Sequence, residues 1–265
     1  KYVMHIASPF PMKVSNDREK LLPVAVDGTL RVLNSSIKNN VEQIIVTSSI
    51  VAMFRKPNRS NPYTFGENDW TDENWIEGVS DYFLSKTRAE RTAWEFMESK
   101  GLKNKLTTIN PGGVFGDALD KKGGTSIEYV RQFLKGKFPA APKFAVLISD
   151  VKDVAKSHVA CIGNKKVGGR RLIVGKEVKK LVELSQIMAE AMPEYAKKVP
   201  KKELPNFMVK LISYIDSSAK TMIPDLGIMM QTDTTYAEDL LGFKFKGAKD
   251  CISENAKSVV KLGLV

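Results

Sequence analysis

Two apolar segments, separated by a helical pattern, constrain the fold of this chain more than any other feature. Residues 44–49 read Ile-Ile-Val-Thr-Ser-Ser, and residues 106–113 read Leu-Thr-Thr-Ile-Asn-Pro-Gly-Gly. Each segment is typical of a buried strand that ends in hydroxyl groups or in a tight turn. A strand, a helix and a second strand in this order predict a parallel α/β sheet, and such sheets bind ligands beyond the carboxyl ends of their strands.

The helical pattern between the two strands begins with Tyr82-x-x-x-Lys86 and meets no Gly or Pro until Gly101. Four residues make about one helical turn, so Tyr82 and Lys86 share a face. A cation about 4 Å from a phenol contributes roughly 4 kcal/mol, which equals about three pKa units. We therefore expect Lys86 to lower the pKa of Tyr82, although these two residues alone also fit an exposed helix.

Other elements follow from periodicity and from Gly and Pro positions. The expected helices cover residues 18–39, 127–134 and 150–162, and several more lie within 181–222. The expected strands cover residues 2–7, 144–148 and 171–174. His5 lies within an apolar strand, so we interpret it as a core residue.

Six short motifs follow one another in a fixed order. They are His5-Ile6-Ala7-Ser8-Pro9, Val26-Asp27-Gly28-Thr29, Thr47-Ser48-Ser49, Tyr82-x-x-x-Lys86, Asn110-Pro111-Gly112 and Asp150-Val151-Lys152-Asp153-Val154-Ala155. With these motifs the chain resembles the extended short-chain dehydrogenase/reductases, the NAD-dependent epimerase/dehydratase superfamily. Within that superfamily it is similar to the dihydroflavonol-4-reductase and cinnamoyl-CoA reductase branch, from the first residue to about Phe243.

This resemblance implies an α/β fold with a Rossmann-type, doubly wound parallel sheet and a smaller C-terminal lobe over the substrate. Residues 1–115 would form the remainder of a dinucleotide-binding domain, and residues 116–265 a mixed substrate-binding lobe that returns strands and helices to the sheet. The segment Tyr2–Ala7 corresponds to the fourth strand of the family's sheet. No glycine-rich fingerprint follows a strand in this chain, so we expect the domain to lack its front, roughly 60–80 residues.

That expectation has two consequences. Tyr2–Ala7 should pair on one side only, with residues 43–47, and its other side should be an apolar, exposed edge. Residues 1–265 alone should also bind NADP poorly and be inactive.

The resemblance also implies a Ser-Tyr-Lys site that reduces a ketone, an aldehyde or an acyl-CoA thioester. Ser49 would hydrogen-bond the carbonyl oxygen and Tyr82 would donate a proton to it. Lys86 would hold the nicotinamide ribose and lower the pKa of Tyr82. Ser48 is the rival of Ser49, because strand alternation directs the two side chains to opposite faces.

The implied cofactor is NADP. NAD is not excluded, because the residues that read the ribose 2′ position would lie in the segment expected to be absent. The expected substrate contacts are Phe10, Met53 and Phe54, and no metal is expected. The expected cofactor contacts are Ala7, Ser8, Thr47, Tyr82, Lys86, Pro111, Gly112, Gly113 and Val114.

Other functions remain open within the same superfamily. The chain could be a truncated, non-catalytic nucleotide-binding relic, or an epimerase or dehydratase. Residues 50–54 read Ile-Val-Ala-Met-Phe, without the Val-Tyr-Gly of sugar epimerases or the Asp-Glu pair of sugar dehydratases. Residues 55–80 form a long polar loop with Tyr63, Phe65, Trp70 and Trp75, which either covers the substrate or packs against the sheet.

Composition limits the partners and the compartment. The net charge is +11, but the basic residues are scattered and not interleaved with aromatics, so nucleic-acid binding is not expected. A weaker alternative is attraction of an anionic cofactor or an acyl-CoA substrate. No run of about 18 apolar residues predicts a membrane span, and two cysteines suggest a reducing cytoplasm. We expect a cytoplasmic monomer or homodimer that acts on a small carbonyl compound.

Overall fold

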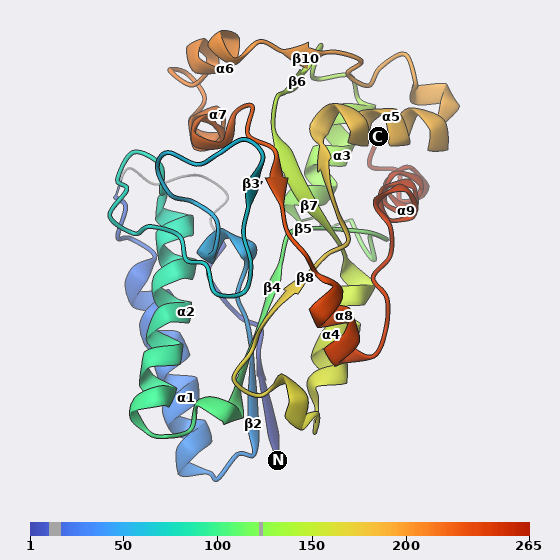
Figure 1. The fold of residues 1–265 in the computed structure, drawn as a ribbon. Helices are drawn as coiled ribbons and strands as arrows, with labels where there is room; N and C mark the ends of the chain where they lie inside the picture. Colours follow the sequence, from blue (N-terminus) through green and yellow to red (C-terminus); the bar gives the residue numbers. More distant parts are fainter. Residues whose placement is uncertain (11–16, 122–123) are drawn as a thin grey trace.

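A four-stranded parallel sheet is the centre of the fold (Figure 1). The computed structural model describes residues 1–10, 17–121 and 124–265. The strands of this sheet lie in the order β1, β2, β4, β8. Their bounds are Tyr2–His5, Gln43–Thr47, Leu106–Pro111 and Arg171–Val174. The predicted Rossmann-type parallel sheet is therefore confirmed.

Helices cover both faces of this sheet (Figure 1). Ile44 and Val46 of β2 face one side, where α1 (Gly28–Lys38) and α2 (Asp81–Ser99) pack. Ile45 faces the other side, where α4 (Val151–Cys161) and α8 (Thr235–Leu241) pack. Successive side chains of a strand alternate between faces, so the continuous apolar run of β2 is what a sheet buried on both sides requires.

Strand β1 lies at the edge of the sheet. It pairs in parallel with β2, Tyr2 opposite Gln43 and His5 opposite Val46, and with no other strand of the described residues. The one-sided pairing is as predicted. Tyr2 at the start of this strand is 45% exposed, and Ile6 directly after it is 59% exposed.

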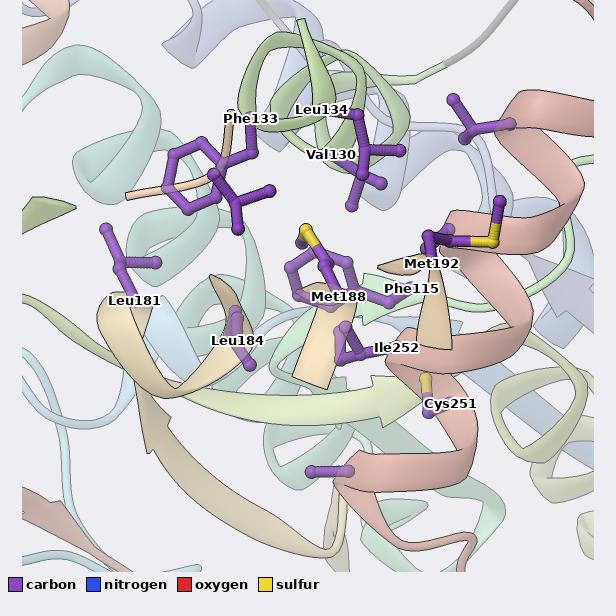
Figure 2. Packing of buried hydrophobic residues seen from close by; sticks show 14 of the residues in the cluster. Phe115, Val130, Phe133, Leu134, Leu181, Leu184, Met188, Met192, Cys251 and Ile252 are labelled. Atoms are coloured by element: carbon purple, nitrogen blue, oxygen red, sulfur yellow. The ribbon is translucent and has the colours of Figure 1, made fainter. Parts of the chain in front are cut away.

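A second, smaller sheet continues from the carboxyl end of β4. Its order is β5 (Gly113–Phe115), β7 (Ala145–Asp150) and β9 (Glu177–Lys180). Helices α3 (Thr125–Leu134), α5 (Leu181–Ala191) and α9 (Ala248–Lys261) pack around it through an apolar cluster (Figure 2). Strand β8 returns from this part of the chain to the first sheet, and the division into residues 1–115 and 116–265 stays a prediction.

The remaining elements are short. They are β3 (Tyr63–Thr64), β6 (Ala141–Pro142), β10 (Glu203–Leu204), β11 (Met230–Gln231), α6 (Asn206–Ile212), α7 (Ser217–Met222), and helical turns at Pro23–Asp27, Ile50–Ala52, Lys103–Lys105, Lys165–Val167, Pro193–Tyr195 and Ile223–Asp225. Strand β3 pairs with β11, which joins the loop of residues 55–80 to the C-terminal part. Over the described residues, none of the helices combines the length and the apolar composition needed to span a bilayer.

One expected boundary was wrong. The helix predicted over residues 18–39 begins later, because a π-helix at Pro23–Asp27 leads directly into α1 at Gly28. Proline lacks the backbone N–H and clashes with the preceding turn, so Pro23 starts a helical segment and cannot lie inside one.

Candidate active site

The carboxyl ends of β2 and β4 and the first turn of α2 meet at one rim of the central sheet. Ser49 follows β2, and its Oγ lies 3.4 Å from the carbonyl oxygen of Pro111 at the end of β4. The Ser49 hydroxyl also forms a side-chain hydrogen bond with Tyr82. Asp81 supports this start of the helix, because its Oδ1 accepts a 2.7 Å hydrogen bond from the Tyr82 N–H.

The phenol of Tyr82 is held in its neutral form. Burial raises the pKa of Tyr82 to about 12, and the hydrogen bond with Ser49 opposes the rise. The prediction that Lys86 lowers this pKa is wrong for this structure, because removal of the phenol from water dominates. A neutral phenol carries the proton that a general acid has to donate. The ring of Phe10 packs edge-on against Tyr82, with the centroids 4.9 Å apart.

Lys86 lies one turn further along α2 and is only 8% exposed. Burial lowers the pKa of Lys86 to about 8, while the charge of Glu90 opposes the decrease. Lys86 lines a hollow at the carboxyl ends of β1 and β2, together with Ala7, Ser8 and Thr47. The structure therefore brings four of the predicted cofactor residues to one place.

His5 lines the same hollow, although the sequence suggested a core position. It is only half-buried because β1 is an edge strand. Burial lowers the pKa of His5, and the nearby charge of Lys86 lowers it further. The two groups therefore disfavour being charged together.

The structure separates the two candidate serines. Ser48 Oγ points into the protein and lies 2.5 Å from Glu90 Oε2. Ser49, and not Ser48, is directed at the Tyr82 hydroxyl. Alternation along the strand explains the difference, since neighbouring residues leave opposite faces.

Glu90 is the main site residue that the sequence analysis missed. It is 2% exposed, and its carboxylate accepts hydrogen bonds from five donors, of which four lie on three strands or their ends. These four are Ser48 Oγ at 2.5 Å, Arg171 Nε at 2.7 Å, Asn110 Nδ2 at 2.8 Å and Thr108 Oγ1 at 2.9 Å, and the fifth is Trp94 Nε1 at 3.3 Å. Burial acts to raise the pKa of Glu90, but Arg171 and these hydrogen bonds outweigh it, and the net shift is downward. Its position four residues after Lys86 was the signal that could have revealed it.

Thr47 is fixed from the opposite face of the sheet. Its Oγ1 lies 2.6 Å from His158 Nε2, and His158 Nδ1 lies 2.8 Å from the Val154 carbonyl oxygen. A carbonyl only accepts, so Nδ1 carries the proton and Nε2 accepts the hydroxyl proton of Thr47. Burial lowers the pKa of His158, which favours this neutral tautomer.

The predicted cofactor residues 111–114 have a clear packing role. A Cβ added at Gly112 would lie 2.2 Å from the Leu147 carbonyl oxygen, and one at Gly113 would lie 2.8 Å from Val146 Cγ2. Both glycines therefore allow β4 and β5 to approach β7. Pro111 is buried and Val114 is partly buried, and contact of residues 111–114 with a cofactor stays a prediction.

The three predicted substrate residues lie in different surroundings. Phe10 is 55% exposed beside Tyr82, whereas Met53 and Phe54 are buried in a cluster with Phe65. The Phe54 ring packs edge-on against Phe83, with the centroids 5.8 Å apart. Met53 and Phe54 therefore pack inside the protein, and contact of these three residues with a substrate stays a prediction.

The long loop is anchored by buried charges. Arg55 and Asp225 are each 2% exposed and form an ion pair at 2.5 Å. Arg59 adds a 2.8 Å ion pair to the same carboxylate, and Arg55 lies 3.6 Å from the centroid of the Phe83 ring. Residues 55–59 thus pack against the C-terminal part of the chain, and a substrate-covering role for this loop stays a prediction.

The parallel sheet and the hollow at its carboxyl rim place the chain among the Rossmann-type α/β proteins. More narrowly, it belongs to the 3-beta hydroxysteroid dehydrogenase/isomerase family, which matches residues 1–163.

Three relatives illustrate this membership. The NADPH-dependent methylglyoxal reductase GRE2 of Saccharomyces cerevisiae is 31% identical over 98% of this chain and 77% of its own length. Cinnamoyl-CoA reductase 1 of Petunia hybrida is 28% identical over 98% of this chain and 71% of its own length. The crystal structure of yeast methylglyoxal/isovaleraldehyde reductase Gre2 complexed with NADPH superposes with a TM-score of 0.77, at 28% identity, over 100% of this chain and 78% of that chain. The predicted relation to the cinnamoyl-CoA reductase branch is confirmed.

Proposed function

We propose that this protein is an NADPH-dependent oxidoreductase that reduces the carbonyl group of an aldehyde, a ketone or an acyl-CoA thioester. The observation that carries the proposal is the convergence of the Ser49 and Tyr82 hydroxyls at the carboxyl rim, with Lys86 one turn along the same helix. The relatives support the substrate class, since their names specify methylglyoxal, isovaleraldehyde and cinnamoyl-CoA.

The residues around the hollow fit a dinucleotide. Ser8 offers a hydroxyl group and Lys86 offers an ammonium group, and both can donate hydrogen bonds to ribose and phosphate oxygens. Among the residues that the structure describes, no carboxylate forms an ion pair with Lys86, so its donors are available to a ligand. When bound, NADPH supplies the hydride.

The protein's own groups would then protonate and hydrogen-bond the carbonyl oxygen. Tyr82 donates its proton to the oxygen as the negative charge develops, and Ser49 donates a hydrogen bond to the same atom. Lys86 holds the ribose hydroxyls with its ammonium group. Phe10 provides an apolar surface beside the reacting group.

In the reverse direction an alcohol would lose a hydride to bound NADP⁺ and a proton to the protein, so the enzyme would act on CH–OH donors. Tyr82 as phenolate would accept the hydroxyl proton. We also propose a cytoplasmic protein that works as a monomer or a homodimer.

The test is a substrate screen with the full-length protein, NADPH and three panels, namely aldehydes, ketones and acyl-CoA thioesters. We expect NADPH consumption, followed by absorbance, to depend on one of these panels and to yield the matching alcohol or aldehyde. Conversion of a nucleotide sugar with no net change in NADPH would instead identify an epimerase or dehydratase. Lack of consumption with all three panels would contradict the proposal.

A further inference from the structure

Glu90 is the third residue in a row along one face of α2. Tyr82, Lys86 and Glu90 are spaced by four residues, so each lies about one turn beyond the last. Glu90 lines the same hollow as Lys86. Glu90 is therefore part of the lining of the site as well as part of the packing between α2 and the sheet.

The network around Glu90 also reaches Ser49. Asn110 Nδ2 donates to Glu90 Oε2 at 2.8 Å and lies 3.2 Å from the Ser49 carbonyl oxygen. Ser48, the neighbour of Ser49, donates to the same carboxylate oxygen at 2.5 Å. One carboxylate thus connects the helix that carries Tyr82 and Lys86 with the strand end that carries Ser49.

Arg171 keeps this carboxylate charged. Its Nε donates to Glu90 Oε1 at 2.7 Å, and its guanidinium group stacks 3.7 Å from the centroid of the Trp70 ring. Its Nη1 also donates to the carbonyl oxygens of Glu67 and Asp69 in the long loop. A buried ion pair often contributes little net stability, so its presence here calls for another role.

We infer that Glu90 is a positioning residue whose carboxylate stabilises the ammonium group of Lys86 and thereby prepares Lys86 to hold the cofactor ribose. The inference rests on the proposed function, because it concerns the role assigned there to Lys86. Glu90 acts through its field, since no ion pair joins it to Lys86 within the described part of the chain.

The electrostatic setting of Lys86 decides the direction of the effect. The titratable groups that line the hollow with it are His5 on β1 and Glu90 on α2. Tyr82 precedes it by one turn of α2, and Arg171 on β8 lies behind Glu90. Glu90 favours the ammonium form, whereas burial disfavours it. Loss of the Glu90 charge should therefore lower the pKa of Lys86 from its value of about 8.

The test measures the Lys86 titration directly, by NMR of protein labelled with ¹³C at lysine Cε, with the signal assigned from a Lys86→Arg variant. Glu90→Gln should lower the pKa of Lys86 by about one unit or more. Glu90→Asp retains the charge and should restore most of the shift. Glu95→Gln changes an exposed residue of the same helix and should leave the titration unchanged.

A double variant, Glu90→Gln with Arg171→Met, guards against misfolding, since it leaves no unpaired charge in the interior. Its Lys86 pKa should lie between those of the wild type and Glu90→Gln, because the repelling guanidinium group is removed as well. A Lys86 pKa within about 0.3 units of the wild type in a folded Glu90→Gln or double variant would overturn the inference. An equal shift in Glu90→Asp and Glu90→Gln would also overturn it.

These measurements need neither substrate nor turnover, so the inference about Glu90 and the proposed reductase function can fail separately. In the full-length enzyme, the alkaline limb of the rate profile should move to lower pH by the same amount as the Lys86 pKa.

Discussion

The rim of the central sheet and the cluster beneath α3 are both buried, but the rim consists of polar and charged side chains and the cluster of apolar ones. At the rim, Ser48, Glu90 and Arg171 are buried and are joined by hydrogen bonds. Beneath α3, Val130, Phe133 and their neighbours form an apolar cluster (Figure 2). The comparison separates a region that carries the candidate site from a region that mainly stabilises the fold.

The two regions respond to burial in opposite ways. Apolar burial contributes roughly 25 cal/mol per Å² of surface removed from water, so the cluster beneath α3 stabilises the fold directly. Burial of Lys86 and Tyr82 disfavours their charged forms and shifts their pKa values to about 8 and about 12. The rim therefore gives up stability to hold groups whose proton affinities differ from those in water. Substitutions in the two regions should separate activity from stability.

The largest effect is expected from Tyr82→Phe. It removes the hydroxyl group proposed as the acid and keeps the ring that contacts Phe10. The rate on the best substrate found in the screen should fall about 100- to 10,000-fold, with cofactor affinity largely retained. Steady-state kinetics and NADPH titration measure the two quantities. Tyr129→Phe makes the same change in the other region and should keep the rate. A Tyr82→Phe rate above about a tenth of the wild type would remove Tyr82 from the mechanism.

The second prediction concerns stability and not the reaction rate. Phe133 is 0% exposed within the apolar cluster, so Phe133→Ala leaves a cavity and should lower the free energy of unfolding by about 3–5 kcal/mol. Urea denaturation followed by circular dichroism measures this loss. Phe207→Ala removes a ring that is 64% exposed and should change the same quantity by less than about 1 kcal/mol. A similar loss in both variants would show that burial in the cluster does not contribute more to the free energy of unfolding than an exposed position does.

The sequence predicted the local elements of the rim well. The apolar run at residues 44–47 and the uninterrupted pattern after Tyr82 correspond to β2 and α2, because each follows from one local period. The order of strand, helix and strand also placed Ser49 and Tyr82 at the same rim. Local pattern and parallel topology were sufficient for these features.

Long-range pairing was not predictable in this way. Arg171 and Glu90 are 81 residues apart, and Arg55 and Asp225 are 170 residues apart, so no local period relates either pair. The expected direction for the Tyr82 pKa was wrong for the same reason. The expectation counted one nearby charge, whereas burial, which depends on how the whole chain packs, dominates in the structure.

The smallest effect is expected from Lys86→Met, which replaces a charged residue of the rim by an apolar one and so makes the rim resemble the cluster. Lys86→Met replaces a buried ammonium group by an apolar side chain of similar length and should raise the free energy of unfolding near pH 7 by about 1–3 kcal/mol. The Lys86 pKa is about 8 in the folded protein and 10.5 as its ordinary value, so between these pH values the unfolded chain binds more protons. Wild-type stability should therefore rise from pH 8 to pH 10.5, and the stability gained by Lys86→Met should shrink over the same interval.

Urea denaturation at a series of pH values gives the free energy of unfolding of both proteins. Lys257→Met, at an exposed position of α9, should show only a small difference without this trend. If the advantage of Lys86→Met stayed constant across that interval, the burial of Lys86 would not be what depresses its pKa.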